Sequence, residues 1–148
     1  MWSDQEIGFW KEYLQAHHGL DGELERLDGE FDLNIAVRVD GRLDAVLKVM
    51  RVGCGSGLVG MQVEALDHLA ATMPDLPVPR VIRRHDGAAA AAVTDLSGDE
   101  RIVWVISAID GLPLGAMRPH PVALVHEIGH TLGLSLIHIS EPTRQLCI

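Results

Sequence analysis

Cysteine and basic residues are both scarce in this chain of 148 residues. Only Cys54 and Cys147 are present, a number that does not suggest a disulfide framework. Lysine and arginine total 12 against 21 acidic residues, which gives a net charge of -9, and the basic residues form no cluster along the sequence. Because binding to nucleic acid requires a basic surface that neutralises phosphates, nucleic acid is not expected as a partner.

Long apolar runs are missing as well. Nowhere do about 18 apolar residues follow one another, the length that a membrane-spanning helix needs. The first residues, MWSDQEIGFW, contain no basic segment followed by an apolar one, so no signal peptide is expected. The sequence therefore predicts no membrane span and no secretion. A cytoplasmic location is expected.

What the chain does contain is enough apolar residues for one modest core. The apolar fraction is 47% and the charged fraction is 22%, values typical of globular domains. Helical spacing of apolar residues predicts helices over residues 4–17, 59–73 and 121–133, the first preceded by a capping box of Ser3 and Glu6.

Between these helices the pattern is typical of short strands. Strands are expected over residues 23–27, 34–39, 44–50, 80–83 and 101–109, and the alanine run 88–92 is read as a strand or the flank of a turn. Asp40-Gly41 suits a tight hairpin because both positions tolerate a positive φ. The order of elements favours an α+β fold, in which one helix packs on an antiparallel sheet and further helices lie at the N- and C-terminal ends.

The last stretch of the chain has an unusual character. Residues 134–144, LSLIHISEPTR, resemble the translation of a sequencing adapter, so we interpret residues 134–148 as an artefactual tail and leave them out of the fold prediction.

A zinc-protease motif, HEIGH, lies at residues 126–130, shortly before this tail. On a helix His126 and His130 lie one turn apart, and Glu127 beside them suits activation of a metal-bound water. The third histidine of the extended motif is replaced by Leu136, so the metal site is incomplete. An apolar stripe of Val122, Val125, Ile128 and Leu132 instead predicts a core-facing helix with two solvated histidines. A zinc metallopeptidase fragment remains an alternative.

A glycine-rich segment gives a second alternative. RVGCGSGLVG, residues 51–60, places Gly55, Gly57 and Gly60 between a strand and a helix, as in loops that bind dinucleotides or S-adenosylmethionine. Arg51 stands where an acidic residue usually introduces the methyltransferase loop, and no acidic residue for the ribose follows at the right distance. A plain flexible connection between strand and helix accounts for the same glycines.

A lysine in an apolar strand is the third feature. In DAVLKVM, residues 44–50, Val46, Lys48 and Met50 share one face of the strand, and Ala45, Leu47 and Val49 share the other. Desolvating the ammonium is costly unless an anion lies nearby, and Glu64 on the following helix is placed to face the sheet. This arrangement is typical of kinases, although a lysine at a sheet edge also explains it.

These features together resemble the aminoglycoside phosphotransferase and choline kinase superfamily, in particular its hydroxylysine-kinase-like branch. The resemblance runs from about Gly19 to Gly133 through LERLDGEFDLNIAVRVDG, AVLKV, LPVPRVI and VWVISAIDGLPL. It implies an ATP-dependent kinase that phosphorylates a hydroxyl of a small amino-bearing molecule. The implied nucleotide-binding residues are Lys48 for the α- and β-phosphates, Glu64 to orient it, Val46 over the adenine, Asn34 in the phosphate-covering loop 29–34, and Ser107 and Ile109 in the hinge.

The chain departs from that family in one respect. No Asp follows Asp110 and no Asn follows Asn34, so the catalytic loop and the Mg2+ ligands are missing. We therefore expect an N-terminal helix at 1–20, a nucleotide-binding lobe at 21–111, and a hinge with the start of a second lobe at 112–133. Alone, such a chain is expected to be inactive, with ATP and Mg2+ as the cofactors of the whole enzyme. A binding module without chemistry is the remaining alternative.

Overall fold

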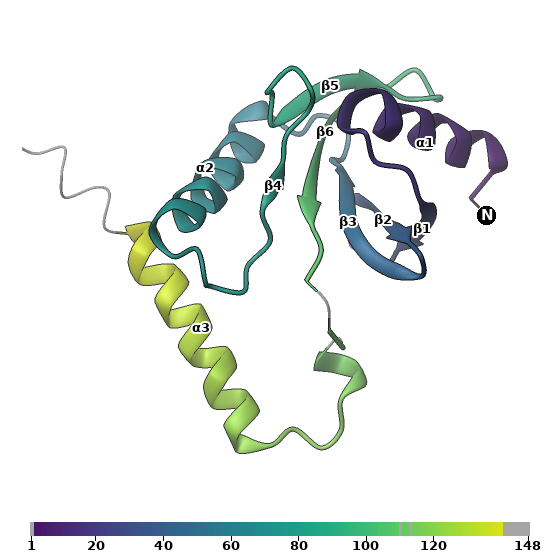
Figure 1. The fold of residues 1–148 in the computed structure, drawn as a ribbon. Coiled ribbons are helices and arrows are strands. Elements are labelled where there is room, and N and C mark those ends of the chain that lie inside the picture. Colours follow the sequence, from purple (N-terminus) through teal and green to yellow (C-terminus); the bar gives the residue numbers. More distant parts are fainter. Residues whose placement is uncertain (1, 110, 113, 141–148) are drawn as a thin grey trace, which may run out of the picture.

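The computed structural model describes residues 2–109, 111–112 and 114–140, and for residues 137–140 the backbone only. Along this part of the chain the elements are α1 (Asp4–His18), β1 (Glu23–Leu27), β2 (Leu33–Val39), β3 (Arg42–Val49), α2 (Ser56–Thr72), β4 (Val81–Ile82), β5 (Ala90–Thr94), β6 (Glu100–Ser107), the 3-10 turn η1 (Leu114–Ala116) and α3 (Val122–Ser140). Figure 1 shows their arrangement.

The strands form one antiparallel sheet in the order β1-β2-β3-β6-β4, and β5 also pairs with β6. β3 therefore lies inside the sheet between β2 and β6. The prediction of an α+β fold with an antiparallel sheet is confirmed. The alanine run, which the sequence left open between strand and turn, contributes its last residues to β5.

Local signals in the sequence explain the first elements. The Ser3 hydroxyl accepts a hydrogen bond from the Glu6 N–H, the Glu6 carboxylate accepts one from the Ser3 N–H, and α1 ends at Gly19 with a φ of 67°. The β2–β3 hairpin turns at Asp40 and Gly41, whose φ values are 51° and 77°. Both the capping box and the hairpin turn are as predicted.

A helix packs on each face of the sheet, where the sequence predicted only one packed helix. On one face Trp10, Tyr13 and Leu14 of α1 pack against a cluster of buried strand residues, namely Ile35, Val37, Ala45, Leu47, Val49, Val103 and Val105. On the opposite face Val59 and Val63 of α2 pack against Met50 and Trp104. Because α1 seals the first face, only the α2 face leaves partly exposed strand residues at the centre of the sheet.

After β6 the chain runs through η1 to α3, which returns to contact α2 (Figure 1). The expected end of this helix near residue 133 is wrong, since α3 continues to Ser140. Leu134 and Leu136 prolong the helix, and no proline lies between Pro121 and Pro142. The interpretation of the tail as an adapter translation stays a prediction, and residues 141–148 lie outside the described residues.

The predicted core stripe of α3 is mostly exposed. Val122, Val125 and Leu132 are 86%, 56% and 57% exposed, and only Ile128 is half-buried. An apolar face of α3 therefore meets solvent. Among the described residues no helix has both the length and the apolar character to cross a membrane.

Candidate nucleotide-binding site

Lys48 lies in the middle of the sheet, on the face that α2 covers in part. Its cross-strand neighbours are Asn34 on β2 and Trp104 on β6, and its side chain is half-buried. Trp104 is only 2% exposed and is part of the core beneath α2. The predicted assignment of Lys48 to the face opposite Leu47 is confirmed.

The ammonium of Lys48 donates a hydrogen bond to the Oδ1 of Asn34 at 3.0 Å. Asn34 is the second residue of β2, which follows the loop of residues 28–32. This loop overlaps residues 29–34, the segment expected to cover the phosphates. The structure thus brings two of the predicted nucleotide-binding residues into direct contact. The family resemblance placed both near a nucleotide, but not against each other.

Glu64 lies on α2, which packs on the same face of the sheet as Lys48, but its side chain is exposed. Its neighbour Val63 occupies the core-facing position of that helical turn. Within the described part of the chain, no ion pair at or below 4.0 Å joins Glu64 and Lys48. The two residues share a face without the contact that the sequence predicted.

Val46 is half-buried on the same face as Lys48, between Ala36 of β2 and Ile106 of β6. The alternation of β3 therefore forms an apolar floor beside the ammonium. A flat apolar base can pack against this surface. The sequence predicted that role, covering the adenine, for Val46.

The two predicted hinge residues differ in how their backbones are engaged. Ser107 ends β6 and exchanges two hydrogen bonds of 2.8 Å with the Arg80 backbone, one through its N–H and one through its hydroxyl. Ile109 comes after the last strand bond, from the Ala108 N–H to the Asp44 carbonyl at 2.9 Å. The Ile109 backbone bonds to no other described residue, and its side chain is 49% exposed, so Ile109 suits a ligand contact better than Ser107 does.

Three further residues, which the sequence did not single out for this site, lie where the 28–32 loop meets the end of β3. The Asp32 carboxylate accepts a hydrogen bond from the Arg51 N–H at 2.9 Å, and the Arg51 guanidinium lies 5.8 Å from the centre of the Phe31 ring. These contacts tie the 28–32 loop to the glycine-rich connection between β3 and α2. In the sequence, the only indication that Arg51 belongs to this site was its position three residues after Lys48.

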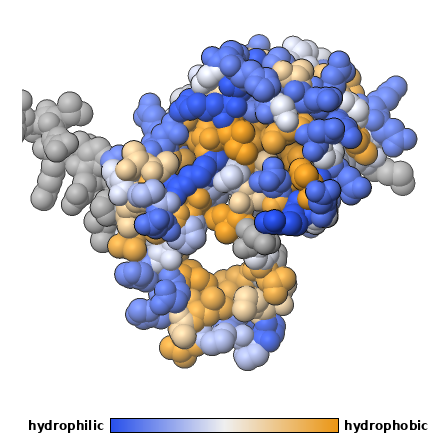
Figure 2. Space-filling view, viewed as in Figure 1, coloured by the Kyte–Doolittle hydropathy of each residue, from blue (hydrophilic) through white to orange (hydrophobic). Residues whose placement is uncertain are grey.

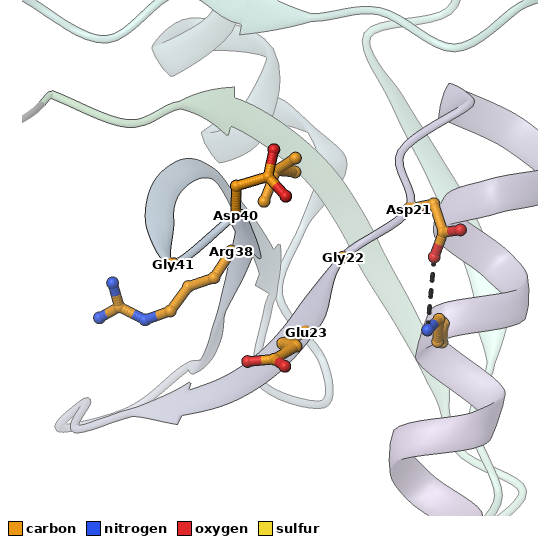
Figure 3. A pocket seen from close by; sticks show the side chains of 8 residues that line it. Asp21, Gly22, Glu23, Arg38, Asp40 and Gly41 are labelled. Atoms are coloured by element: carbon orange, nitrogen blue, oxygen red, sulfur yellow. Dashed lines mark ion pairs between the residues drawn. The ribbon is translucent and has the colours of Figure 1, made fainter.

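The other lysine of the chain is bound differently. Lys11 of α1 forms an ion pair of 3.3 Å with Asp21, and both line a shallow pocket at the tip of the β2–β3 hairpin with Glu23, Arg38 and Asp40 (Figure 3). None of the predicted site residues lines this pocket. Lys11 has a carboxylate partner, whereas in the described structure Lys48 has only the neutral Asn34 amide.

Shifted pKa values occur at the end of α1, on the other face of the sheet. Burial lowers the pKa of His18 and raises the pKa of Tyr13. The backbone N–H of Ala88 lowers the pKa of Asp86. This cluster contacts the turn before β5 and not the Lys48 face.

The two competing motifs fit the structure poorly. His126, Glu127 and His130 are exposed on α3, and no group of three potential metal ligands occurs among the residues that the structure describes. The glycine-rich segment precedes α2, but the sheet is antiparallel, whereas dinucleotide-binding and methyltransferase folds are built on mostly parallel sheets. Neither alternative is favoured.

An antiparallel sheet with a lysine on an inner strand and a helix on the lysine's face fits the N-terminal lobe of a kinase-like fold. The chain is similar to a solved structure of such an enzyme, amicoumacin kinase hAmiN in complex with AMP-PNP, Ca2+ and Ami, with a TM-score of 0.55 and 15% identity. The similarity covers 74% of this chain and 32% of that chain, so this chain spans about a third of that kinase. No family model and no curated protein matches the sequence.

Proposed function

We propose that this chain is the nucleotide-binding lobe of an ATP-dependent phosphotransferase that acts on a hydroxyl of a small amino-bearing molecule. The observation that carries the proposal is the environment of Lys48, a half-buried ammonium on an inner strand whose hydrogen-bond partner is a neutral amide. A desolvated cation without a carboxylate attracts a polyanion, and a triphosphate supplies that charge.

Each residue of the site then has a distinct role. Lys48 binds the α- and β-phosphates, Val46 packs against the adenine, and Ile109 offers backbone groups to its edge. Asn34 and the 28–32 loop lie beside the phosphates. Glu64 orients Lys48 in the proposed nucleotide complex, which requires a rotation of its exposed side chain toward the sheet.

Hydrophobic surface occurs in two parts of the molecule that face each other across an opening (Figure 2). Figure 2 shows it in the middle of the lobe and again on the η1–α3 segment, on the two sides of an opening. The exposed side chains on the η1–α3 segment include Leu112, Leu114, Val122 and Val125. A base bound between these surfaces would be shielded from water on both sides.

The described residues do not fit a magnesium site. They contain no group of three potential ligands, and no Asp follows Asp110 in the sequence. We therefore propose that the Mg2+ ligands and the carboxylate that orients the acceptor hydroxyl belong to a second lobe outside this chain. The small-molecule substrate would bind mainly there, so this chain alone supplies nucleotide contacts but no phosphoryl transfer.

The chain permits a sharp test because Lys11 and Lys48 are its only lysines. An acyl-phosphate derivative of ATP transfers its acyl group to an amine held beside the phosphates. We expect mass spectrometry to find the label on Lys48 in excess over Lys11, and excess AMP-PNP to suppress the Lys48 label alone. Equal labelling of both lysines, unaffected by AMP-PNP, contradicts the proposed function.

A thermal-shift series supplies the matched control. AMP-PNP is expected to raise the melting temperature of the wild-type chain and of Lys11→Ala, because a ligand that binds only the folded state stabilises it. Lys48→Ala should lose this rise. A rise that persists in Lys48→Ala would place the nucleotide elsewhere.

A further inference from the structure

The contact between Asn34 and Lys48 depends on an irregularity in the hairpin. From the turn, Val39 pairs with Arg42 and Arg38 with Leu43, but Val37 pairs with Ala45, so Asp44 is an extra residue on β3. Without this bulge Lys48 would lie opposite Leu33, which has no hydrogen-bonding side chain. The bulge brings an amide oxygen to the ammonium instead.

The 28–32 loop packs against the side-chain amide of Asn34. A Cβ added to Gly29 would lie 2.8 Å from the Asn34 Nδ2 and 2.5 Å from the Asp32 carbonyl oxygen. The Gly29 backbone therefore lies close to the amide and leaves no room for a side chain between them. Asp32 in turn is bound to the Arg51 N–H, which fixes the other end of the loop.

We propose that Asn34 positions Lys48 before the nucleotide binds, and that its amide transmits the position of the 28–32 loop to the ammonium. This inference rests on the proposed function, because the positioned ammonium is the group that receives the triphosphate. A neutral acceptor holds the lysine in place without neutralising it, so the full positive charge remains for the ligand. A carboxylate at the same position would compete with the phosphates.

A spectroscopic test of the contact needs no nucleotide. Asn34 is the only asparagine of the chain, so selective 15N-asparagine labelling gives one side-chain amide signal. Lys48→Met is expected to shift this signal, because it removes the hydrogen-bond donor at Oδ1. Lys11→Met, which removes the other lysine, should leave it unchanged. An amide signal that Lys48→Met does not move overturns the proposal.

The charge argument is tested by Asn34→Asp, an isosteric change that pairs the ammonium with a carboxylate. We expect AMP-PNP affinity to fall by about tenfold or more, equivalent to ~1.4 kcal/mol. The matched control is Gln15→Glu, the same change from amide to acid at an exposed position of α1, with affinity expected within about twofold of wild type. Equal losses in both variants overturn the charge argument.

The link to the loop is tested by Gly29→Ala, since the added methyl group displaces the Asn34 amide. This variant should shift the 15N signal and weaken AMP-PNP binding. Gly8→Ala is the control, because a Cβ at Gly8 meets nothing within 4 Å. An unchanged amide signal in a folded Gly29→Ala overturns the link. If the wild-type chain does not bind AMP-PNP, the proposed function is wrong. In that case the 15N signal still tests the hydrogen bond between Asn34 and Lys48.

Discussion

Arg101 donates a hydrogen bond from Nε to the backbone carbonyl of Met50 at 2.7 Å. Its Nη1 also forms an ion pair of 3.2 Å with Asp95, and the two side chains are 18% and 14% exposed. The guanidinium thereby joins the end of β3, two residues after Lys48, to the β5–β6 turn. The backbone that carries the proposed site therefore depends on this largely buried arginine.

Arg101→Met should lower the free energy of unfolding by about 2–4 kcal/mol, because Asp95 and the Met50 carbonyl lose their partner inside the protein. Arg38→Met is the control. Arg38 pairs with Glu25 at the surface, where an ion pair contributes about 0.2–1 kcal/mol. Urea unfolding of both variants measures the difference, and equal losses would refute the structural role of Arg101.

Glu64→Gln is expected to weaken AMP-PNP binding less than Asn34→Asp does. Glu64 is exposed and, among the described residues, forms no ion pair with Lys48 in the absence of nucleotide. The ranking of the two dissociation constants, measured by calorimetry, decides the point. A larger loss in Glu64→Gln would mean that the carboxylate dominates the positioning of the lysine.

The stability of the chain should fall as the pH decreases below about 6.5, the ordinary pKa of histidine. Burial lowers the pKa of His18 in the folded state, so the unfolded chain binds a proton first and is favoured at lower pH. The loss is complete once the pH passes below the folded pKa. The groups that face His18 are Tyr13, His17, Arg83, Arg84 and His85.

Urea unfolding of His18→Gln between pH 5 and pH 8 checks this prediction. The variant should show a flatter dependence of unfolding free energy on pH than the wild type. His126→Gln, at an exposed position of α3, should retain the wild-type dependence. A flattened curve in His126→Gln and not in His18→Gln would assign the effect to α3.

Metal analysis should find less than one zinc per chain. The two histidines of the HEIGH motif are exposed, and no third ligand lies near them among the described residues. Stoichiometric zinc that disappears in His126→Ala would revive the metallopeptidase hypothesis.

The apolar face of α3 should make the chain prone to self-association. Val125→Lys combined with Leu132→Lys removes two exposed apolar side chains and is expected to raise the solubility limit. Ala123→Lys adds charge to the same helix without removing a large apolar side chain. Light scattering at increasing concentration compares them, and similar improvement in both would attribute the effect to charge alone.

The sequence predicted those parts of the fold that depend on short-range signals. Ser3 with Glu6, Gly19, and Asp40-Gly41 set helix and hairpin boundaries through neighbours within a few residues. The alternation in β3 also placed Lys48 on the correct face. These signals do not depend on the rest of the chain, which is why they were readable.

The contacts of the site were less predictable because they depend on register and on packing between distant segments. A regular two-residue hairpin would have paired Lys48 with Leu33, and only the bulge at Asp44 brings Asn34 to it. The packing of α1 on the sheet and the exposure of Val122 and Val125 likewise depend on which surfaces meet.

The layer beneath α1 also limits how this sheet can change. Leu47 and Val49, the neighbours of Lys48 along β3, are sealed under that helix with Leu14. Inserting one residue into β3 directly before Leu47, with no bulge to absorb it, would turn the ammonium into this dry layer and expose the leucine in its place. Such an insertion would destabilise the fold much more than a substitution on the Lys48 face, so new specificity in this sheet arises more readily by substitution on alternate residues.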